Sequence, residues 1–471
     1  MKVHNNCYYV LLVLILFIAG CKKLVETDPP VNKLVTATVF ANDNTAIAAQ
    51  LAIYAQMQAF PWNIEAYTAL SSDELVNYSS NQTGIDLYSN NLNAINDGSA
   101  LFWAPIYKYI YQENAIIENT KASGGITPNA KKLLLGEAEF LRAYLYFYLV
   151  NLYGDAPLVT TTNYKINSVM ARTPKAQVYA QIIADLTDAQ GKLSPTFLDQ
   201  TDTSTTVDRV RPTSWAASAL LARVYLYTGQ YDSASIAASN VINNTSLFGL
   251  PALSSVFLKN SLEAIWQIMP PSTQLYTYDA NYFILTKPPS SSTIINNGCG
   301  ISTQLLNAFE AGDQRKTTWI NNYKNGATTW YYPYKYKDNG LSTGFSTIRE
   351  YTMVLRLAEQ YLIRAEARAQ KNDLVDAISD VNVIRKRTGL AALSTTLTQA
   401  QVLSAITHER QVELFTEAQR WLDLKRTNTV DAIMSVVTLQ KGGTWNTNQQ
   451  LYPLQVSDIL TGTNLIQNPG Y

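Results

Sequence analysis

The feature that most constrains the fold is the segment 140–160, which reads FLRAYLYFYLVNLYGDAPLVT. Leucine and aromatic residues recur in it at steps of three and four, so they share one face of a helix. Gly154 provides a helix stop, and Pro157 prevents the helix from resuming. The sequence therefore predicts a buried helix that ends in a tight exit.

Two later stretches share a pattern of small residues and turn residues. Gly229 in the stretch 222–234 and Asn372 in the stretch 365–377 stand at the same offset. Gly and Asn best tolerate the left-handed conformation that ends a helix. Each stretch predicts a helix, a short turn and a second helix, like a tetratricopeptide hairpin, with ordinary helical packing as the alternative. Two further units are expected, from 102–119 with 131–153 and from 356–387 with 400–426.

The stretch 245–352 interrupts the helical pattern, because prolines recur in it and Ser, Thr, Asn and Gly fill the intervals. Eight of the 30 tyrosines lie between residues 276 and 336, together with two tryptophans. Tyr and Trp offer a flat apolar face and a polar tip, which suit the C–H face and the hydroxyls of a sugar. We predict a ligand-binding aromatic region, although packing is the alternative for any single ring. The candidates are Tyr276, Tyr278, Trp319, Trp330 and Tyr331 here, and Trp62, Tyr78 and Trp103 in a second patch.

The charge balance and the counts of cysteine and histidine exclude several classes of function. The 36 basic and 36 acidic residues cancel, whereas a nucleic-acid-binding surface is basic. Beyond residue 21 the chain has one cysteine, Cys299, and one histidine, His408. A disulfide, a zinc site and a Cys–His catalytic pair are therefore not expected. We predict no metal site, no cofactor and no catalytic residue.

A glycoside hydrolase is the main enzymatic alternative. Its chemistry needs two carboxyl groups that flank a cleft, and no further pattern supports the candidates Asp73 and Glu74. Three other glutamates recur at four-residue steps and share one helix face. Because basic residues are interspersed with them, we predict a solvated or ion-paired face. They are Glu409, Glu413 and Glu417, in a helix predicted over 409–426.

The N-terminus reads as a secretory signal that ends at a cysteine. Lys2 precedes an apolar run over 10–18, which is too short to remain as a membrane span. Small residues stand directly before Cys21, as in a bacterial lipobox, whose cysteine is acylated, typically with palmitate. We predict a signal peptide at 1–20, lipidation of Cys21 and a polar tether over 21–35. An ordinary cleaved signal is the alternative.

Several motifs in order carry a resemblance to one family. They are Arg142 with NLYGDAP at 151–157, RWLDLKR at 420–426, LYP at 451–453 and QNPGY at 467–471. The set resembles the SusD/RagB family, although Leu454-Gln455 stands where Ile-Pro is more usual. The resemblance implies a surface-exposed outer-membrane lipoprotein that captures nutrients, usually glycans, for a TonB-dependent, SusC-like transporter. In that family, ligand contacts come largely from the two aromatic loop regions.

These features predict an all-α fold, in which tetratricopeptide-like hairpins form a superhelical scaffold beside a loop-rich, aromatic ligand-binding subdomain. The expected divisions after the tether are a helical region 36–244, an insertion 245–352 and a C-terminal region 353–471 with a helical hairpin. The expected function is capture of an oligo- or polysaccharide for the transporter at the cell outer membrane. A peptide or another nutrient as cargo, a hydrolase and a pure interaction scaffold are the alternatives.

Overall fold

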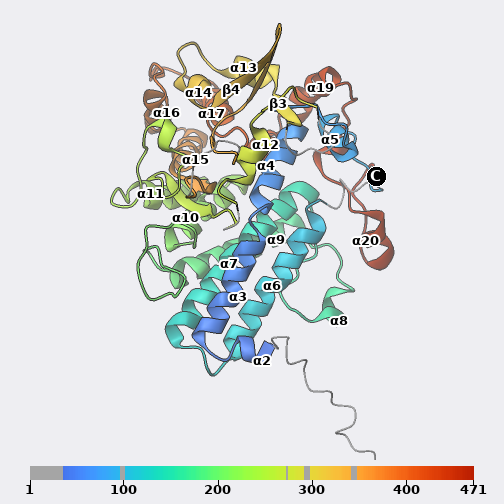
Figure 1. Cartoon of the computed structure of the whole chain (residues 1–471), viewed down its shortest axis with the longest axis vertical. Coiled ribbons are helices and arrows are strands. Elements are labelled where there is room, and N and C mark those ends of the chain that lie inside the picture. Colours follow the sequence, from blue (N-terminus) through green and yellow to red (C-terminus); the bar gives the residue numbers. More distant parts are fainter. Residues whose placement is uncertain (1–35, 96–100, 272–273, 291–296, 341–346) are drawn as a thin grey trace, which may run out of the picture.

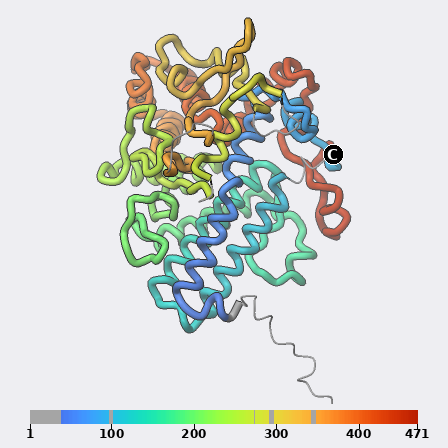
Figure 2. The backbone as a smooth tube through the Cα atoms, viewed as in Figure 1, coloured from blue at the N-terminus to red at the C-terminus, as the bar shows by residue number. Residues whose placement is uncertain are grey.

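The computed structural model describes residues 36–95, 101–271, 274–290, 297–340 and 347–471. The predicted signal peptide, tether and Cys21 lie outside the described residues. Long helices from the first part of the chain, drawn in blue and cyan, form one end of the molecule, and a small β-hairpin projects at the opposite end (Figures 1 and 2). Within the described ranges, no helix is both long and apolar enough to cross a membrane.

The long helices build the predicted array. They are α3 (Asp43–Gln56), α6 (Trp103–Ala122), α7 (Pro128–Tyr153), α9 (Lys175–Lys192), α10 (Ser214–Tyr227), α11 (Tyr231–Ile242), α15 (Leu357–Gln370), α16 (Leu374–Arg387) and α17 (Gln399–Glu413). In chain order, α6 packs on α7, α7 on α9, α9 on α10, α10 on α11, α11 on α15, and α15 on α16. Each helix thus buries its apolar faces against its neighbours, as in helical repeats. The predicted helical scaffold is confirmed.

Two of the hairpins turn at the residues that the sequence indicated. Gly229 between α10 and α11 has a φ of +71°, and Asn372 between α15 and α16 has a φ of +62°. Gly and Asn reach this left-handed conformation at low cost, so the chain can reverse within three residues. The alanines on both sides are fully buried and let the helices approach closely. They are Ala222, Ala234, Ala365 and Ala377.

The buried helix predicted from the segment 140–160 is the C-terminal half of α7, which is buried on every side. Arg142 Nε and Nη2 donate to the two carboxylate oxygens of Asp185 at 2.8 and 2.7 Å. Gly154 ends the helix with a φ of +76°, as predicted. The backbone N–H of Tyr452 then donates to Leu152 O at 2.8 Å, so the C-terminal segment closes over the helix end. Arg142, Gly154 and Tyr452, which belong to the motifs given above, therefore have structural roles.

The helix predicted over 409–426 is wrong as a continuous element. α17 ends at Glu413, and α18 (Arg420–Arg426) begins after an irregular break. Within the break, Thr416 has a φ of +53° and Ala418 a φ of +58°. Left-handed backbone costs roughly 1–2 kcal/mol at each such residue, so other contacts must hold the break in place.

Those contacts are a buried ion-pair network, so the acidic face is ion-paired and not solvated. Arg356 Nη1 lies 2.7 Å from Glu413 Oε1, and Arg356 Nε lies 2.6 Å from Glu417 Oε2. Arg315 Nη1 lies 2.9 Å from Glu413 Oε2, and Lys335 Nζ lies 2.5 Å from Glu417 Oε1. Because Arg315 and Lys335 belong to the stretch predicted as an insertion, the network joins that stretch to the helical array.

Three two-stranded antiparallel sheets accompany the helices within the described residues. β1 (Leu75–Asn77) pairs with β3 (Cys299–Ile301). β2 (Ala264–Ile268) pairs with β6 (Thr352–Arg356), and β4 (Ile320–Asn325) pairs with β5 (Thr328–Pro333). The fold is therefore mostly helical, with short strands placed largely in the interrupted stretch.

The interrupted stretch has a small hydrophobic core of its own. Trp319, Phe257 and Leu305 lie in it, and Val412 and Phe415 enter from the end of α17. The divisions at 245 and 352 stay predictions. The remaining elements are α2 (Thr36–Val39), α4 (Phe60–Ser71), α5 (Gln82–Tyr88), α8 (Tyr164–Asn167), η3 (Leu253–Ser255), α12 (Tyr278–Phe283), α13 (Thr303–Ala308), α14 (Gln314–Thr318), α19 (Val430–Gln440), η4 (Thr447–Gln450) and α20 (Val456–Thr461).

Candidate functional site

The β4–β5 hairpin carries aromatic side chains at the projecting end of the molecule (Figure 1). Tyr323 and Trp330 are opposite each other on one face, with ring centroids 6.4 Å apart. Because side chains alternate along a strand, Tyr331 projects from the other face, opposite Asn322, and it is 40% exposed. The first face packs partly on the small core. The hairpin thus presents an open tyrosine ring on one face and a half-buried indole on the other.

Tyr78 reaches the hairpin from the second predicted patch. β1 pairs with β3, and β3 packs beside β5. A Cβ atom on Gly300 of β3 would lie 2.9 Å from Tyr78 Cε2 and 3.0 Å from Tyr331 O. The Tyr78 ring therefore lies on the backbone of Gly300, where only glycine leaves room for it beside β5. The structure thus brings Tyr78, which is far away in the sequence, close to the backbone of β5 at Tyr331.

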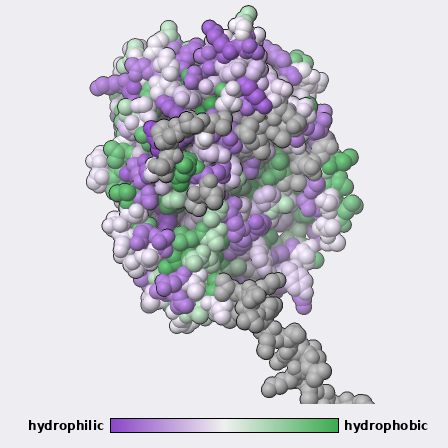
Figure 3. Space-filling view, in the orientation of Figure 1, coloured by the Kyte–Doolittle hydropathy of each residue, from purple (hydrophilic) through white to green (hydrophobic). Residues whose placement is uncertain are grey.

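A polar pocket of about 510 Å³ opens beside β1 and β3. Hydrophilic residues cover much of this end of the molecule (Figure 3). The ammonium of Lys441 in the pocket donates to Leu70 O at 2.8 Å, and burial lowers the pKa of Lys441 to about 7. The pocket therefore offers mainly neutral donors and acceptors. These come from Ser302, Thr303, Gln304, Asn307 and Gln440. Tyr78, Trp330, Tyr331 and this pocket are called the hairpin site below.

Three of the predicted ring residues lie in the hydrophobic core. The exposed fraction is 0% for Trp319, 4% for Trp62 and 6% for Trp103. Trp319 Nε1 donates to Leu253 O at 3.0 Å, and the Trp62 ring is in edge contact with Tyr282. A sugar stacks only on an open ring face. The structure therefore favours packing for Trp62 and Trp319, which was the alternative for any single ring, whereas Trp103 also lines a pocket beside α6.

Tyr276 and Tyr278 are half-buried. A Cβ atom on Gly340 would lie 2.1 Å from Tyr276 Cε1, so the Tyr276 ring rests on that glycine. Tyr278 is the first residue of α12 and packs against the main core. A role for either residue in ligand binding stays a prediction.

The acidic pair Asp73 and Glu74 does not have the geometry of a glycoside hydrolase. Arg420 Nε and Nη2 donate to the two Asp73 carboxylate oxygens at 2.8 and 2.7 Å. Glu74 is 1% exposed, and burial, together with the neighbouring Asp73, raises the pKa of Glu74 to about 8. Hydrolysis needs two carboxyl groups that are open to one cleft. Here one is held by an arginine and the other is out of reach of solvent.

The surroundings of Cys299 and His408 also indicate structural roles for both residues. Burial raises the pKa of the Cys299 thiol to about 12, so little thiolate forms at neutral pH. His408 Nε2 lies 2.7 Å from Ala308 O. Across the described part of the chain, no three His, Cys, Asp or Glu side chains are grouped so that they could hold a metal ion.

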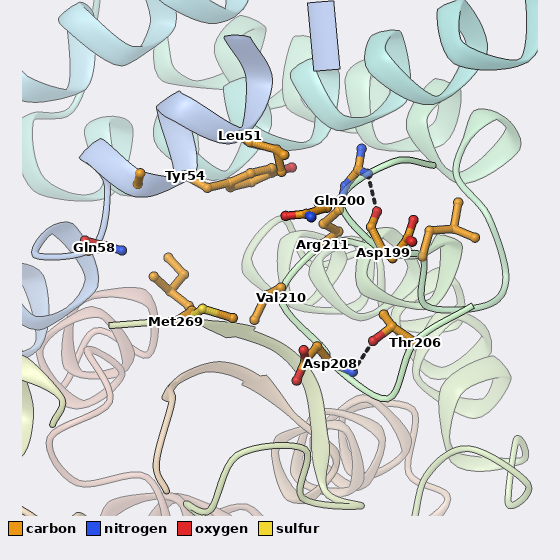
Figure 4. A pocket seen from close by; sticks show the side chains of 13 residues that line it. Leu51, Tyr54, Gln58, Asp199, Gln200, Thr206, Asp208, Val210, Arg211 and Met269 are labelled. Carbon is orange, nitrogen blue, oxygen red and sulfur yellow. Dashed lines mark hydrogen bonds between the residues drawn. The ribbon is translucent and has the colours of Figure 1, made fainter. Parts of the chain in front are cut away.

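A second pocket, of about 390 Å³, lies between α3, the segment 198–211 and the end of β2 (Figure 4). Its buried charges are paired within the protein. Tyr54 Oη donates to Glu137 Oε2 at 2.7 Å, and Arg211 Nη2 donates to Glu137 Oε1 at 2.5 Å. Tyr54 supplies the one aromatic ring among its described lining residues. The hairpin site includes three of the predicted aromatic residues and is therefore the better candidate for a ligand.

Sequence reasoning did not find the polar residues of the hairpin site. Ser302 begins α13, where its Oγ accepts from the backbone N–H of Leu305 at 3.0 Å. The one sequence signal for these polar residues was Gly300, which is followed by Ser302 at the start of α13. Hydroxyl and amide residues are common in loops, so their types alone did not distinguish them.

Comparisons with known proteins agree with this architecture. A family profile described as "SusD family" matches residues 290–471, and a profile described as "Starch-binding associating with outer membrane" matches residues 28–226. The chain is similar to SusD-like protein P2 of Formosa agariphila, with 27% identity over 512 residues that cover 98% of each chain. The two profiles thus match separate halves of one continuous similarity.

Solved structures share the fold at low sequence identity. A SusD superfamily protein from Bacteroides vulgatus superposes with a TM-score of 0.80 at 17% identity, over 92% of this chain and 100% of that chain. A structure described as a laminarin binding SusD-like protein gives a TM-score of 0.74 at 22% identity, over 91% and 100%. At such identities the similarity concerns the fold and not the ligand.

Proposed function

The chain belongs to the SusD family, and from that premise we propose that it binds carbohydrate at the outer membrane. The family consists of binding proteins and not of enzymes. We place the ligand at the hairpin site. The observation that carries the proposal is that Tyr78 lies close to β5, the strand that bears Trp330 and Tyr331, and that a pocket of hydroxyl and amide groups opens beside the adjacent strands β1 and β3.

The chemistry of the hairpin site suits a neutral sugar. The open Tyr331 ring matches the C–H face of a pyranose, and the pocket residues can exchange hydrogen bonds with its hydroxyls. The one ammonium in the pocket wall, that of Lys441, is already used by backbone carbonyls. The description of one matching family profile names starch, and that of one similar structure names laminarin. We therefore take α- and β-glucans as the first probes.

We further propose that acylated Cys21 holds the protein on the outer membrane and that a TonB-dependent, SusC-like transporter receives the glycan. Support comes from the lipobox-like residues before Cys21 and from the family. Mild detergent extraction and native pull-down test the partner. Recovery of the chain alone under these conditions would contradict the transporter proposal.

Binding of purified residues 22–471 to laminarin and to soluble starch tests the site. Affinity electrophoresis and titration calorimetry should show that Tyr331→Ala and Trp330→Ala each weaken binding about tenfold, because one ring contact contributes on the order of 1 kcal/mol. Trp215→Ala is the matched control, since Trp215 is a half-buried indole on α10 whose Nε1 donates to Pro195 O at 2.9 Å. It should leave binding unchanged.

Three results would count against the proposal. If both hairpin variants bind glycan as tightly as wild type, the binding site does not lie on β5. Binding of peptides, with no binding of any glycan, would favour the alternative cargo. Reducing ends that appear in proportion to the protein would indicate a hydrolase.

A further inference from the structure

A third pocket lies on the side of the helical layer, away from the hairpin site. It has a volume of about 490 Å³ and is enclosed by α6, by the segment 157–170 that contains α8, and by α20. Figure 1 places α8 and α20 beside the long helices, whereas the β4–β5 hairpin lies at the far end. The pocket therefore belongs to a different surface from the hairpin site. It is called the side pocket below.

The side pocket is lined by aromatic rings from two separate parts of the chain. Tyr111 on α6 is 51% exposed, and Tyr164 on α8 is 71% exposed, so both present open ring faces. Trp103 and Tyr107 form the floor, with ring centroids 4.9 Å apart. Tyr107 Oη donates to Pro157 O at 2.9 Å, which fixes the floor to the opposite wall. Two tyrosine faces thus stand over a rigid apolar base.

One acceptor in the side pocket has no donor among the described residues, and a carboxylate also lies in the pocket wall. Asn167 Oδ1 is buried without a hydrogen-bond partner, while Asn167 Nδ2 donates to Thr161 O at 2.8 Å. The half-buried carboxylate of Asp458 also lines the pocket, and burial raises the pKa of Asp458. A buried acceptor without a donor costs about 1–3 kcal/mol, so a ligand that brings donors gains affinity here.

We propose that the side pocket is a second carbohydrate-binding site for a neutral sugar. Sugar hydroxyls supply the donor that Asn167 lacks and can also donate to Asp458, and sugar C–H faces match the rings of Tyr111 and Tyr164. A cationic ligand fits less well, because Arg172 lies at the end of α7 beside the pocket, where its Nη2 donates to Tyr153 O at 2.7 Å. The ligand class rests on the proposed function, whereas the location does not.

A second site on another surface has a physical consequence for capture. Binding of one polymer chain, or of neighbouring chains in a matrix, at two weak sites raises the overall affinity through effective concentration. A short oligosaccharide cannot use both sites at once in this way. The side pocket should therefore add more to the binding of polysaccharide than to the binding of a trisaccharide.

The experiment compares three variants of the mature chain, residues 22–471. One is Tyr111→Ala with Tyr164→Ala, the second is Trp330→Ala with Tyr331→Ala, and the third combines all four changes. Each is titrated by calorimetry with trisaccharides from laminarin and from starch and with both polymers, and tetramethylammonium serves as the cationic probe. Crystals soaked in the better trisaccharide locate the bound molecules. Exposed tyrosines are removed, so folding should be preserved, and circular dichroism checks this.

We expect wild type to bind two trisaccharides, each double variant to bind one, and the combined variant to bind none. For the polymers, the side-pocket variant should lose about tenfold or more in affinity. If the hairpin variant alone abolishes all binding, the side-pocket inference fails while the proposed function stands. If the side-pocket variant alone abolishes it, the inference stands and the hairpin site fails. Binding of tetramethylammonium without any glycan, or no glycan binding by wild type, overturns both.

Discussion

The two indoles at positions 319 and 330 look alike in the sequence, yet the structure predicts opposite effects for their replacement. Trp319 is fully buried, and its ring centroid lies 5.5 Å from that of Phe257. Lys335 Nζ lies 5.2 Å from the Trp319 ring centroid. Replacement by alanine leaves a cavity and deprives Leu253 O of its donor. A buried Trp→Ala change costs about 3–5 kcal/mol, and the unpaired carbonyl adds about 1 kcal/mol. Trp319→Ala should therefore lower the free energy of unfolding by roughly 4–6 kcal/mol.

Trp330→Ala is the matched comparison, because its indole is half-buried on β5. Only part of its area leaves water on folding, so we expect a loss of about 1–2 kcal/mol in stability together with the loss in glycan affinity. Urea unfolding followed by far-UV circular dichroism measures both variants without relying on tryptophan fluorescence. A loss below about 2 kcal/mol for Trp319→Ala would refute the reasoning from burial. So would weaker glycan binding by Trp319→Ala while its stability is retained.

Three further changes test buried acids and the anchor. Burial and the neighbouring Asp279 raise the pKa of Glu65, and Glu65 Oε2 and Asp279 Oδ1 lack donors, as expected if the two carboxyls share a proton. A raised carboxyl pKa removes stability as pH rises above the unfolded value. The stability of Glu65→Gln relative to wild type should therefore increase as pH rises above about 4, and an equal difference at all pH values would contradict this. Glu413→Gln removes a carboxylate that accepts from Arg356 Nη1 at 2.7 Å, and it should cost about 3–5 kcal/mol of stability above pH 5. Arg387, Arg356 and Arg315 lower the pKa of Glu413, so the loss should shrink as pH falls below about 4, as urea unfolding would show. Cys21→Ala should release a folded protein from membranes, and unchanged membrane fractionation would disprove the lipid anchor.

Local signals predicted the helical scaffold well. The hairpins at Gly229 and Asn372 follow from helical periodicity, small residues and a left-handed turn, all of which lie within a short stretch of chain. The predicted helix over 409–426 failed for the opposite reason. Thr416 and Ala418 give no local sign of positive φ, and their conformation is imposed by ion pairs with residues far away in the sequence. Propensity was overridden there by tertiary contacts.

The candidate site was predictable only as a list of rings. Residue type does not say which of Trp62, Trp319 and Trp330 is buried, because all three tryptophans satisfy the same sequence criteria. The contact between Tyr78 and the hairpin depends on Gly300 in a strand that lies between them in space. That pairing is long-range and very short, so the sequence carried little signal for it.

The ion-pair network explains why a site on an irregular stretch can hold its rings in one place. Buried ion pairs add little net stability, because their desolvation offsets most of the attraction, but they require a definite geometry. Arg315 and Lys335 flank the β4–β5 hairpin in the sequence, and both pair with glutamates at the end of α17. The hairpin is therefore fixed to the array at both of its ends. A ring that is already positioned loses little conformational freedom when a sugar binds, which matters most where each ring contributes only on the order of 1 kcal/mol.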